Sequence, residues 1–125
     1  DNKIRYIVDD CIKFVEREIR RGNRYDAVIL DPPSYGRGPN GERWVLEEKL
    51  DTLIGIIANL LSDNPLFVLL NSYTTGLSAS TNGYILHNRL VRRFGGRVES
   101  DELGIPVQES GFPLPCGASS RWTPD

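Results

Sequence analysis

The chain has 125 residues, 39% of them hydrophobic and 26% charged, and its formal net charge is −2. These values fit one ordinary soluble domain, or part of one. They exclude a disordered chain, which would carry fewer apolar residues and more net charge. No apolar run approaches the length of a membrane span, so we expect no membrane partner. Because the charge balance is slightly acidic, a nucleic-acid partner would need a local basic patch.

The cysteine and methionine counts bear on the compartment and on the limits of the chain. Cys11 and Cys116 are too few for a disulfide framework, and a single His leaves no structural zinc site. With no signal peptide or basic targeting stretch, we expect a cytoplasmic protein with reduced thiols. The sequence contains no Met and therefore no initiator. We interpret residues 1–125 as a single partial domain from a longer protein.

Short apolar runs alternate with segments of helical periodicity along the chain. This alternation predicts an α/β fold with a mostly parallel sheet and crossover helices on its faces. The expected strands are 4–8, 25–30, 66–70 and one that begins at 97–100. The expected helices are 11–21, 46–60 and one that starts at Ser78 or Ser80 and ends at Gly95-Gly96. We expect a loop at 34–43 and an irregular tail or edge hairpin at 111–122.

Local signals define the ends of the first elements. Asp9-Asp10 stands where a helix N-cap belongs, and Gly22-Asn23 follows the helix. The strand at 25–30 is apolar enough for burial on both faces. It stops at Asp31, because Pro32-Pro33 cannot donate ladder hydrogen bonds.

Three places in the predicted sheet are candidates for a ligand site. Strand 25–30, helix 46–60 and strand 66–70 make a βαβ unit with a right-handed crossover. In such sheets ligands bind beyond the carboxyl ends of the strands. Polar or aromatic groups follow an apolar strand at Asp9-Asp10-Cys11, at Asp31-Pro32-Pro33-Ser34-Tyr35 and at Asn71-Ser72-Tyr73.

Asp31-Pro32-Pro33 is the most specific of the three. A carboxylate at a strand end and a fixed prolyl carbonyl beside it would form a rigid acceptor cluster for an amine or a water. Tyr35 could stack on a flat substrate such as a base. Asp-Pro-Pro is also good turn chemistry anywhere in a protein. Its position directly after an apolar strand favours a functional role.

The other polar groups have a structural and a functional interpretation. Asp9 and Asp10 fit an acidic helix start that the helix dipole stabilises. Alternatively, Asp10 accepts a ligand amine while the Cys11 N–H donates, and together they read an adenine edge. Asn71-Ser72 is either a polar strand end or a substrate contact. Cys116 has no His near it in sequence, so we favour a non-catalytic thiol over a nucleophile.

The basic residues gather in two stretches, and His87 lies between Leu86 and Asn88 in a predicted helix. The basic stretches are Arg17, Arg20, Arg21, Arg24 and Arg89, Arg92, Arg93, Arg97. We favour solvated helix faces paired with nearby Glu over contacts to an RNA backbone, because the net charge is acidic. We expect His87 at the surface or at a boundary.

The stretches IRYIVDDCIKFVERE, RYDAVILDPPSYGRGPNGE and LFVLLNSY resemble the class I S-adenosylmethionine-dependent methyltransferases. The similarity is greatest to the bacterial group of rRNA large-subunit methyltransferases, and it runs over nearly the whole chain. It implies a Rossmann-like sheet of seven strands with an antiparallel last hairpin strand, S-adenosylmethionine as cofactor and rRNA as substrate. It assigns Asp10, Cys11 and Asp31 to cofactor binding and Asp31, Pro32, Pro33 and Tyr35 to catalysis.

The sequence departs from the family pattern near the cofactor. The glycine-rich first motif and the acidic residue that holds the ribose are not in this chain, which would therefore lack the first two strands. Strands 4–8 and 25–30 would leave a gap, pair directly or take strands from a second copy, and exposed edges would favour self-association. We expect the chain alone not to bind the cofactor tightly. Ser34 also separates Tyr35 from the second proline, whereas in many amino-methyltransferases the aromatic follows directly.

Methyl transfer to nitrogen or oxygen is the expected chemistry. Transfer to cytosine C5 needs a Cys nucleophile near the strand ends, and neither Asn71-Ser72-Tyr73 nor Asp31-Pro32-Pro33 supplies one. Asp31 would orient the acceptor with little acid–base work. The main alternative is a catalytically inactive binding or assembly module of the same fold. A different nucleotide-binding α/β protein is disfavoured, because Asp9-Asp10 would repel phosphate at the helix start.

Overall fold

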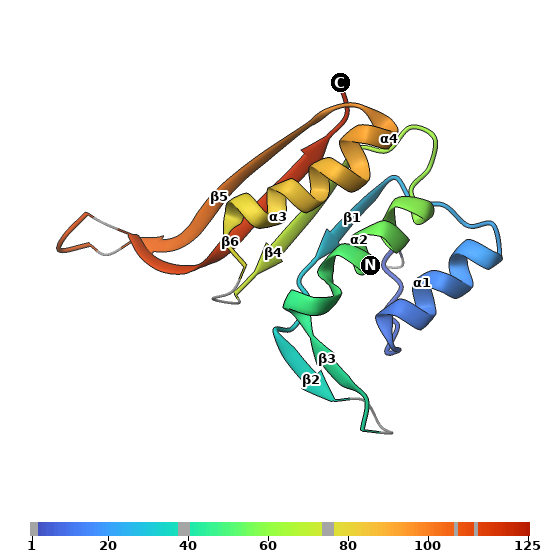
Figure 1. Cartoon of the computed structure of the whole chain (residues 1–125), viewed down its shortest axis with the longest axis horizontal. Coiled ribbons are helices and arrows are strands. Elements are labelled where there is room, and N and C mark those ends of the chain that lie inside the picture. The colour runs from blue at the N-terminus through green and yellow to red at the C-terminus, as the bar shows by residue number, and fades with distance from the viewer. Residues whose placement is uncertain (1–2, 38–40, 74–76, 107, 112) are drawn as a thin grey trace.

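The computed structural model of the chain describes residues 3–37, 41–73, 77–106, 108–111 and 113–125. In chain order the elements are α1 Cys11–Arg20, β1 Ala27–Leu30, β2 Tyr35–Arg37, β3 Arg43–Val45, α2 Leu46–Leu60, β4 Phe67–Ser72, α3 Ala79–Leu86, the π-helical turn η1 His87–Val91, α4 Arg92–Phe94, β5 Arg97–Pro106 and β6 Pro113–Thr123. The main sheet has four strands in the order β1-β4-β6-β5, and β2 pairs with β3 in a small second sheet (Figure 1). No helix in the described part of the chain is long and apolar enough to cross a membrane.

The predicted βαβ unit is confirmed. β1 and β4 are parallel, with Ala27 opposite Phe67 and Leu30 opposite Leu70, and α2 connects them. β6 runs antiparallel to both β4 and β5. The α/β class is therefore confirmed, although only one of the three pairings in the described main sheet is parallel. The sheet is less parallel than expected because the run at 4–8, predicted as a further strand, forms no strand.

Two predicted helix caps are confirmed. Asp10 caps α1, and its carboxylate accepts a hydrogen bond from the Lys13 N–H at 3.0 Å. Gly22 ends that helix with a φ of +80°, a conformation that glycine adopts without strain. At α3 the cap is Ser78 rather than Ser80, because the Ser78 hydroxyl accepts from the Thr81 N–H at 3.1 Å.

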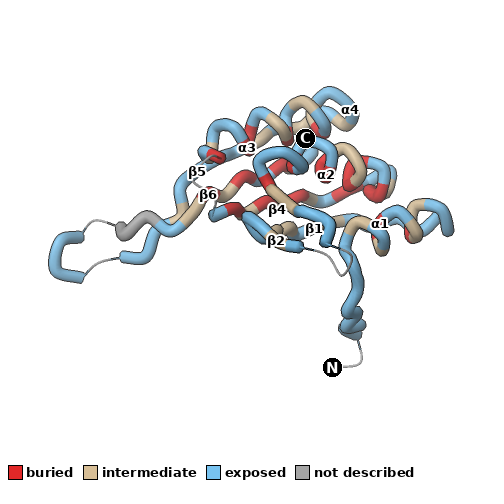
Figure 2. The backbone as a smooth tube through the Cα atoms, turned by 60° about the horizontal axis from the view of Figure 1, so that its bottom comes forward, coloured by how far each residue is buried: buried red, intermediate tan, exposed pale blue. Residues whose placement is uncertain are grey.

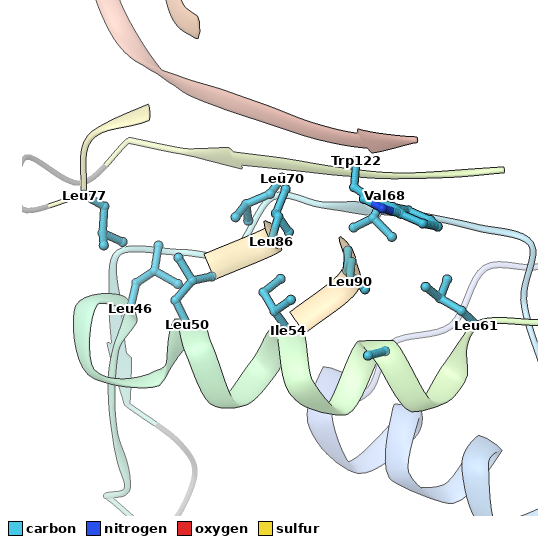
Figure 3. Close-up of a cluster of buried hydrophobic side chains, with 11 residues drawn as sticks. Leu46, Leu50, Ile54, Leu61, Val68, Leu70, Leu77, Leu86, Leu90 and Trp122 are labelled. Carbon is cyan, nitrogen blue, oxygen red and sulfur yellow. The ribbon is translucent and has the colours of Figure 1, made fainter. Parts of the chain in front are cut away.

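One face of the main sheet carries the hydrophobic core. Side chains from α2, α3, η1, β4 and β6 meet there in a single buried cluster (Figure 3). Its fully buried members include Leu50, Ile54, Leu70, Leu86 and Trp122. Burial of each large apolar side chain stabilises the fold by about 1.5–3 kcal/mol before entropy losses are counted. α1 joins through a second cluster, in which Val15 contacts the α2 residues Leu53 and Ile57.

The opposite face and the β1 edge are much more open. Along β4, Phe67 and Leu69 are only half-buried, while their neighbours Val68 and Leu70 are fully buried. Ile29 in β1 is 65% exposed, so the prediction of burial on both faces is wrong. The reason is that β1 is an edge strand in the described sheet and the helices cover only one face.

The strand predicted at 4–8 is wrong. These residues form no regular structure, and Tyr6 and Val8 are 86% and 105% exposed (Figure 2). A strand exists only through hydrogen bonds to a neighbouring strand, and no described strand pairs with this segment. The apolar pattern is therefore present without the partner that would order it.

Two further expectations are corrected by the sheets. The predicted loop at 34–43 contains strands β2 and β3, which pair Tyr35 with Val45 and Arg37 with Arg43. The tail at 111–122 is neither irregular nor an edge, because β6 lies between β4 and β5 and Trp122 is fully buried under α3 and η1. The strand expected from 97–100 is confirmed and continues to Pro106 as β5.

Candidate functional site

The candidate site lies at the carboxyl edge of the parallel pair. Because Leu30 and Leu70 are opposite each other, Asp31 leaves the sheet beside Asn71, which remains in β4 and pairs with Ser119 of β6. The β2–β3 hairpin stands at this edge below the end of β1 (Figure 1). The long β5–β6 hairpin extends past the end of β4 at the same edge (Figure 1).

Asp31-Pro32-Pro33 is held from one side by β3. The Trp44 Nε1–H donates to the Pro33 carbonyl at 2.7 Å, and the Leu46 N–H donates to the Ser34 carbonyl at 3.0 Å. The Asp31 side chain is exposed. No hydrogen bond from a described residue reaches its carboxylate or the Pro32 carbonyl. Asp31 and Pro32 are thus the two open acceptors of the motif, whereas Pro33 is tied to the hairpin.

Tyr35 follows on β2 with its ring 55% exposed. The Arg37 guanidinium carbon lies 6.0 Å from the centre of that ring, within the range of a cation–π contact. The ring is therefore available at the surface beside Asp31, despite the intervening Ser34.

Asp9 and Asp10 have different roles at the start of α1. Asp9 accepts from the Arg17 guanidinium at 2.6 Å and from the Asp10 N–H at 2.8 Å. These hydrogen bonds lower the pKa of the Asp9 carboxyl below its usual value. Asp10 uses Oδ1 for the helix cap, and among the described groups nothing bonds to its Oδ2. Cys11 is exposed, and its N–H is one of the first-turn donors that a helix leaves without an internal acceptor.

A cavity of about 510 Å³ lies between β1 and the beginning of α1. Its lining is mostly apolar and includes Asp9, Cys11 and all of β1 from Ala27 to Leu30. Asp10 and Asp31 do not line it themselves, but each directly adjoins a lining residue. The structure thus brings the Asp10–Cys11 pair and Asp31 to the margins of one cavity.

Tyr25 also lines this cavity, and its hydroxyl forms a hydrogen-bonded pair with the Glu18 carboxylate. Its hydroxyl donates to Glu18 Oε1 at 2.5 Å, and the Asn23 amide donates to Glu18 Oε2 at 2.8 Å. These two bonds lower the pKa of Glu18, and the first of them raises the pKa of Tyr25. Glu18 is only 5% exposed, so the pair anchors α1 to the beginning of the β1 strand region.

At the third predicted place, Asn71-Ser72-Tyr73, one side chain is buried in the core and another lies at the surface. Ser72 is 1% exposed and accepts from the buried Asn82 amide at 2.7 Å, which makes it a core contact and not a substrate contact. Tyr73 is 52% exposed and lies against β6 at Gly117. A Cβ on Gly117 would lie 2.6 Å from Tyr73 Cδ1, so only glycine permits this position of the ring.

Cys116 is closer to this edge than the sequence indicated. Ser72 at the end of β4 pairs with Ala118, so Cys116 lies past the end of β4, one residue beyond the Gly117–Tyr73 contact. Its thiol is exposed. The reason given for excluding carbon methylation, that no Cys lies near the strand ends, is therefore wrong, because distant β6 supplies one.

The arginine stretches behave largely as predicted, and His87 is exposed at the start of η1. Arg17, Arg21, Arg89 and Arg97 pair with Asp9, Glu18, Asp51 and Glu99 respectively. Four of the eight arginines in these stretches are thus neutralised by described carboxylates. In the described ranges, no group of three His, Cys, Asp or Glu side chains could hold a metal ion.

The sequence reasoning missed Trp44 and Arg37. Both belong to the β2–β3 hairpin, which places them beside Asp31-Pro32-Pro33. A signal was present, because a Gly-rich connection with Asn-Gly at positions 40 and 41 separates Tyr35 from Trp44 and Val45, which is typical of a hairpin.

Comparison with solved structures defines the class of fold. A SAM-dependent methyltransferase from Agrobacterium tumefaciens is 35% identical with a TM-score of 0.83, over 98% of this chain and 40% of that one. A Streptococcus mutans protein assigned as a SAM-dependent methyltransferase is 15% identical with a TM-score of 0.64, over 93% of this chain and 30% of that one. SMU.776, assigned as a methyltransferase and solved with SAH, is 19% identical with a TM-score of 0.60 over the same shares.

These neighbours are SAM-dependent methyltransferases, and the chain has their class I fold. The predicted Rossmann-like methyltransferase fold is therefore confirmed. The chain spans about 40% of the length of the Agrobacterium protein. No family model matches the chain, and no curated protein matches it.

Proposed function

We propose that this chain carries the methyl-acceptor part of an S-adenosylmethionine-dependent methyltransferase that acts on RNA, specifically rRNA, at nitrogen or oxygen. The observation that carries the proposal is the position of Asp31-Pro32-Pro33. The motif follows β1, adjoins the end of β4 and borders a cavity that reaches Cys11. The 35% identity with a SAM-dependent methyltransferase over nearly the whole chain supports the choice of cofactor.

The residues at the start of α1 fit the adenine end of S-adenosylmethionine. The open Asp10 Oδ2 is an acceptor and the Cys11 N–H is a donor, which is the pattern that the amino group and ring nitrogen of adenine require. The apolar lining between Cys11 and Leu30 suits the flat base. When bound, the cofactor would supply a methyl group on a sulfonium, whose thioether product is a good leaving group.

Asp31 and Pro32 would act on the methyl acceptor. The Asp31 carboxylate and the Pro32 carbonyl can accept two hydrogen bonds from an amino group, which orients its lone pair. Tyr35 would support the acceptor ring from one side, since base–aromatic stacking contributes about 1–3 kcal/mol per base. The Trp44–Pro33 hydrogen bond keeps the motif rigid, so its acceptors need little reorganisation on binding.

We further propose that the chain acts as the C-terminal part of a longer cytoplasmic enzyme. The open edge of β1, the exposed apolar run at 4–8 and the 40% coverage of the Agrobacterium protein support this. Further strands would complete the sheet and the ribose side of the cofactor site. The chain alone is then expected to bind the cofactor weakly and to self-associate through the β1 edge.

An inactive binding or assembly module is the second candidate, and one observation favours it. The Pro33 and Ser34 carbonyls are both used by the hairpin, which is how a purely structural Asp-Pro-Pro turn would look. Such a module would bind S-adenosylhomocysteine or RNA without any transfer of a methyl group.

The test is transfer of labelled methyl from S-adenosylmethionine by the full gene product that contains this chain. Undermethylated rRNA, total cell protein and a small-molecule extract serve as acceptors, and the methylated nucleoside is identified by mass spectrometry. We expect label in rRNA at nitrogen or oxygen, unchanged by Cys116→Ser. Label in protein, or none in any acceptor, would contradict the proposal. A C5-methylated product lost in Cys116→Ser would contradict the assignment to nitrogen or oxygen.

A further inference from the structure

The β2–β3 hairpin carries an exposed arginine, Arg37, close in sequence to the candidate acceptor site. Six arginines in the described chain form ion pairs with carboxylates: Arg17, Arg21, Arg43, Arg89, Arg97 and Arg121. Arg37 is exposed, and no described carboxylate lies within ion-pair distance of it. Its recorded contact is with the face of the Tyr35 ring.

The placement of Arg37 is unfavourable for the hairpin itself. Arg37 lies directly opposite Arg43 in the β2–β3 register, and like charges in opposed positions destabilise a sheet. Glu48 neutralises Arg43, with both carboxylate oxygens 3.1 Å from its Nη2. Arg37 is thus an exposed cation with no described carboxylate at ion-pair distance. It lies on the face that also carries Tyr35, because residues two apart in a strand share a face.

The hairpin is also fixed relative to the candidate acceptor site. Trp44 donates to the Pro33 carbonyl, and the Leu46 N–H donates to the Ser34 carbonyl. Tyr35 and Arg37 thus stand at a set position beside Asp31. A guanidinium in a cation–π contact with an aromatic ring still has edge N–H donors free, and their geometry matches a phosphate.

We propose that Arg37 contacts a backbone phosphate of the RNA whose target base lies against Tyr35 and Asp31. The inference rests on the proposed methyl transfer to RNA and deepens it. Tyr35 and Arg37 together would contact a ring and its adjoining phosphate, which are the two parts of an unpaired nucleotide. A basic protein segment is the disfavoured substrate, because Arg37 would repel it.

The experiment measures binding of a short, fluorescein-labelled, single-stranded RNA to the full gene product across a series of salt concentrations. The variants are Arg37→Gln, Arg37→Lys and Tyr35→Leu. Arg92→Gln is the matched control, because Arg92 is an exposed α4 arginine that pairs with no described carboxylate (Figure 1). Circular dichroism checks the fold of each variant, and calorimetry measures its affinity for S-adenosylhomocysteine.

We expect Arg37→Gln to weaken RNA binding about tenfold and to reduce the salt slope by about 0.7, the value for one phosphate contact on a single strand. Arg37→Lys should lose less, Tyr35→Leu should weaken binding with an unchanged slope, and Arg92→Gln should match wild type. All variants should keep wild-type affinity for S-adenosylhomocysteine.

Three results would overturn the inference. These are equal RNA binding by Arg37→Gln and wild type, equal losses in Arg37→Gln and Arg92→Gln, and no RNA binding by wild type. If wild type and Arg37→Gln bind RNA equally well and both bind S-adenosylhomocysteine, the inference fails while the proposed methyl transfer to RNA stands. If Arg37-dependent RNA binding occurs without any affinity for S-adenosylhomocysteine, the inference holds and the proposed function fails.

Discussion

Two parts of the molecule contain similar apolar residues and differ completely in burial. Leu70 and Trp122, in the sheet under α2 and α3, are fully buried, whereas Tyr6 and Val8 before α1 are exposed (Figure 2). The first pair has strand neighbours on both sides and helices above. The second pair has neither among the described residues. The comparison teaches that an apolar run defines a strand only when hydrogen-bonding partners are in place.

The candidate site lies where these two parts meet. Asp31 follows the edge strand β1, which the packed part holds through β4, and Asp10 follows the exposed run at 4–8. The methyl-acceptor side therefore rests on the packed part, while the cofactor side rests on the open part. Substitutions in the packed part should therefore lower stability, whereas substitutions in the open part should lower ligand affinity.

The largest expected effect is loss of stability in Trp122→Ala. Its indole is fully buried, donates to the Gly95 carbonyl at 2.9 Å and packs against Phe94. Removal should lower the free energy of unfolding by about 3–5 kcal/mol. Val8→Ala is the matched control and should change it by less than about 0.5 kcal/mol. Urea unfolding measures both, and similar losses would mean that segment 4–8 is buried in solution.

The next effect concerns the cofactor side. Asp10→Asn retains a good N-cap, so stability should change by only a few tenths of a kcal/mol. The amide can no longer offer a free carboxylate oxygen to an adenine amino group. Affinity of the full gene product for S-adenosylhomocysteine should therefore fall about tenfold by calorimetry. Asp9→Asn is the control, and an equal loss of affinity there would remove the specific role of Asp10.

A smaller effect is expected at the hairpin anchor. Trp44→Phe keeps an aromatic side chain but removes the hydrogen bond to the Pro33 carbonyl. The free energy of unfolding should fall by about 1 kcal/mol, the usual net value of one such bond. Methyl transfer should fall as well, because the Asp-Pro-Pro motif loses its rigid support, while the affinity for S-adenosylhomocysteine should stay constant. A drop in that affinity would show that the hairpin also shapes the cofactor side.

The smallest expected effect is a pH dependence of the free energy of unfolding that arises from Glu18. Its hydrogen bonds lower its pKa in the folded state below the ordinary value of 4.5, so the ionised form stabilises the fold above that pH. This stabilisation is lost as the pH falls through the folded-state pKa. The difference in unfolding free energy between wild type and Glu18→Gln should therefore narrow on acidification. A difference that is constant across this range would exclude an ionised Glu18 in the folded protein.

The sequence predicted the elements whose signals are local. The Asp10 cap, the Gly22 stop and the three- and four-residue steps of α2 were all confirmed. Errors occurred where pairing between distant segments decides the outcome. The run at 4–8 lacks a partner, and β6 inserts between β4 and β5, which periodicity cannot reveal.

The same division holds for the candidate site. Asp31 and Tyr35 could be proposed from the sequence because both lie within five residues after one predicted strand. The approach of Cys116 to the end of β4 depends on the β4–β6 register, and the support of Pro33 by Trp44 depends on the β2–β3 hairpin. Neither contact has a signature in adjacent residues. The contacts in the site that depend on pairing between distant strands could therefore not be predicted from the sequence alone.

The most direct test of the central claim compares turnover and cofactor affinity in Asp31→Ala. Methyl transfer to rRNA by the full gene product is measured with labelled S-adenosylmethionine, and affinity for S-adenosylhomocysteine is measured by calorimetry on the same samples. If Asp31 orients the methyl acceptor, turnover should fall about 100-fold while affinity stays within about twofold. Equal losses in turnover and affinity, or unchanged turnover, would contradict the role of Asp31 at a methyl-transfer site.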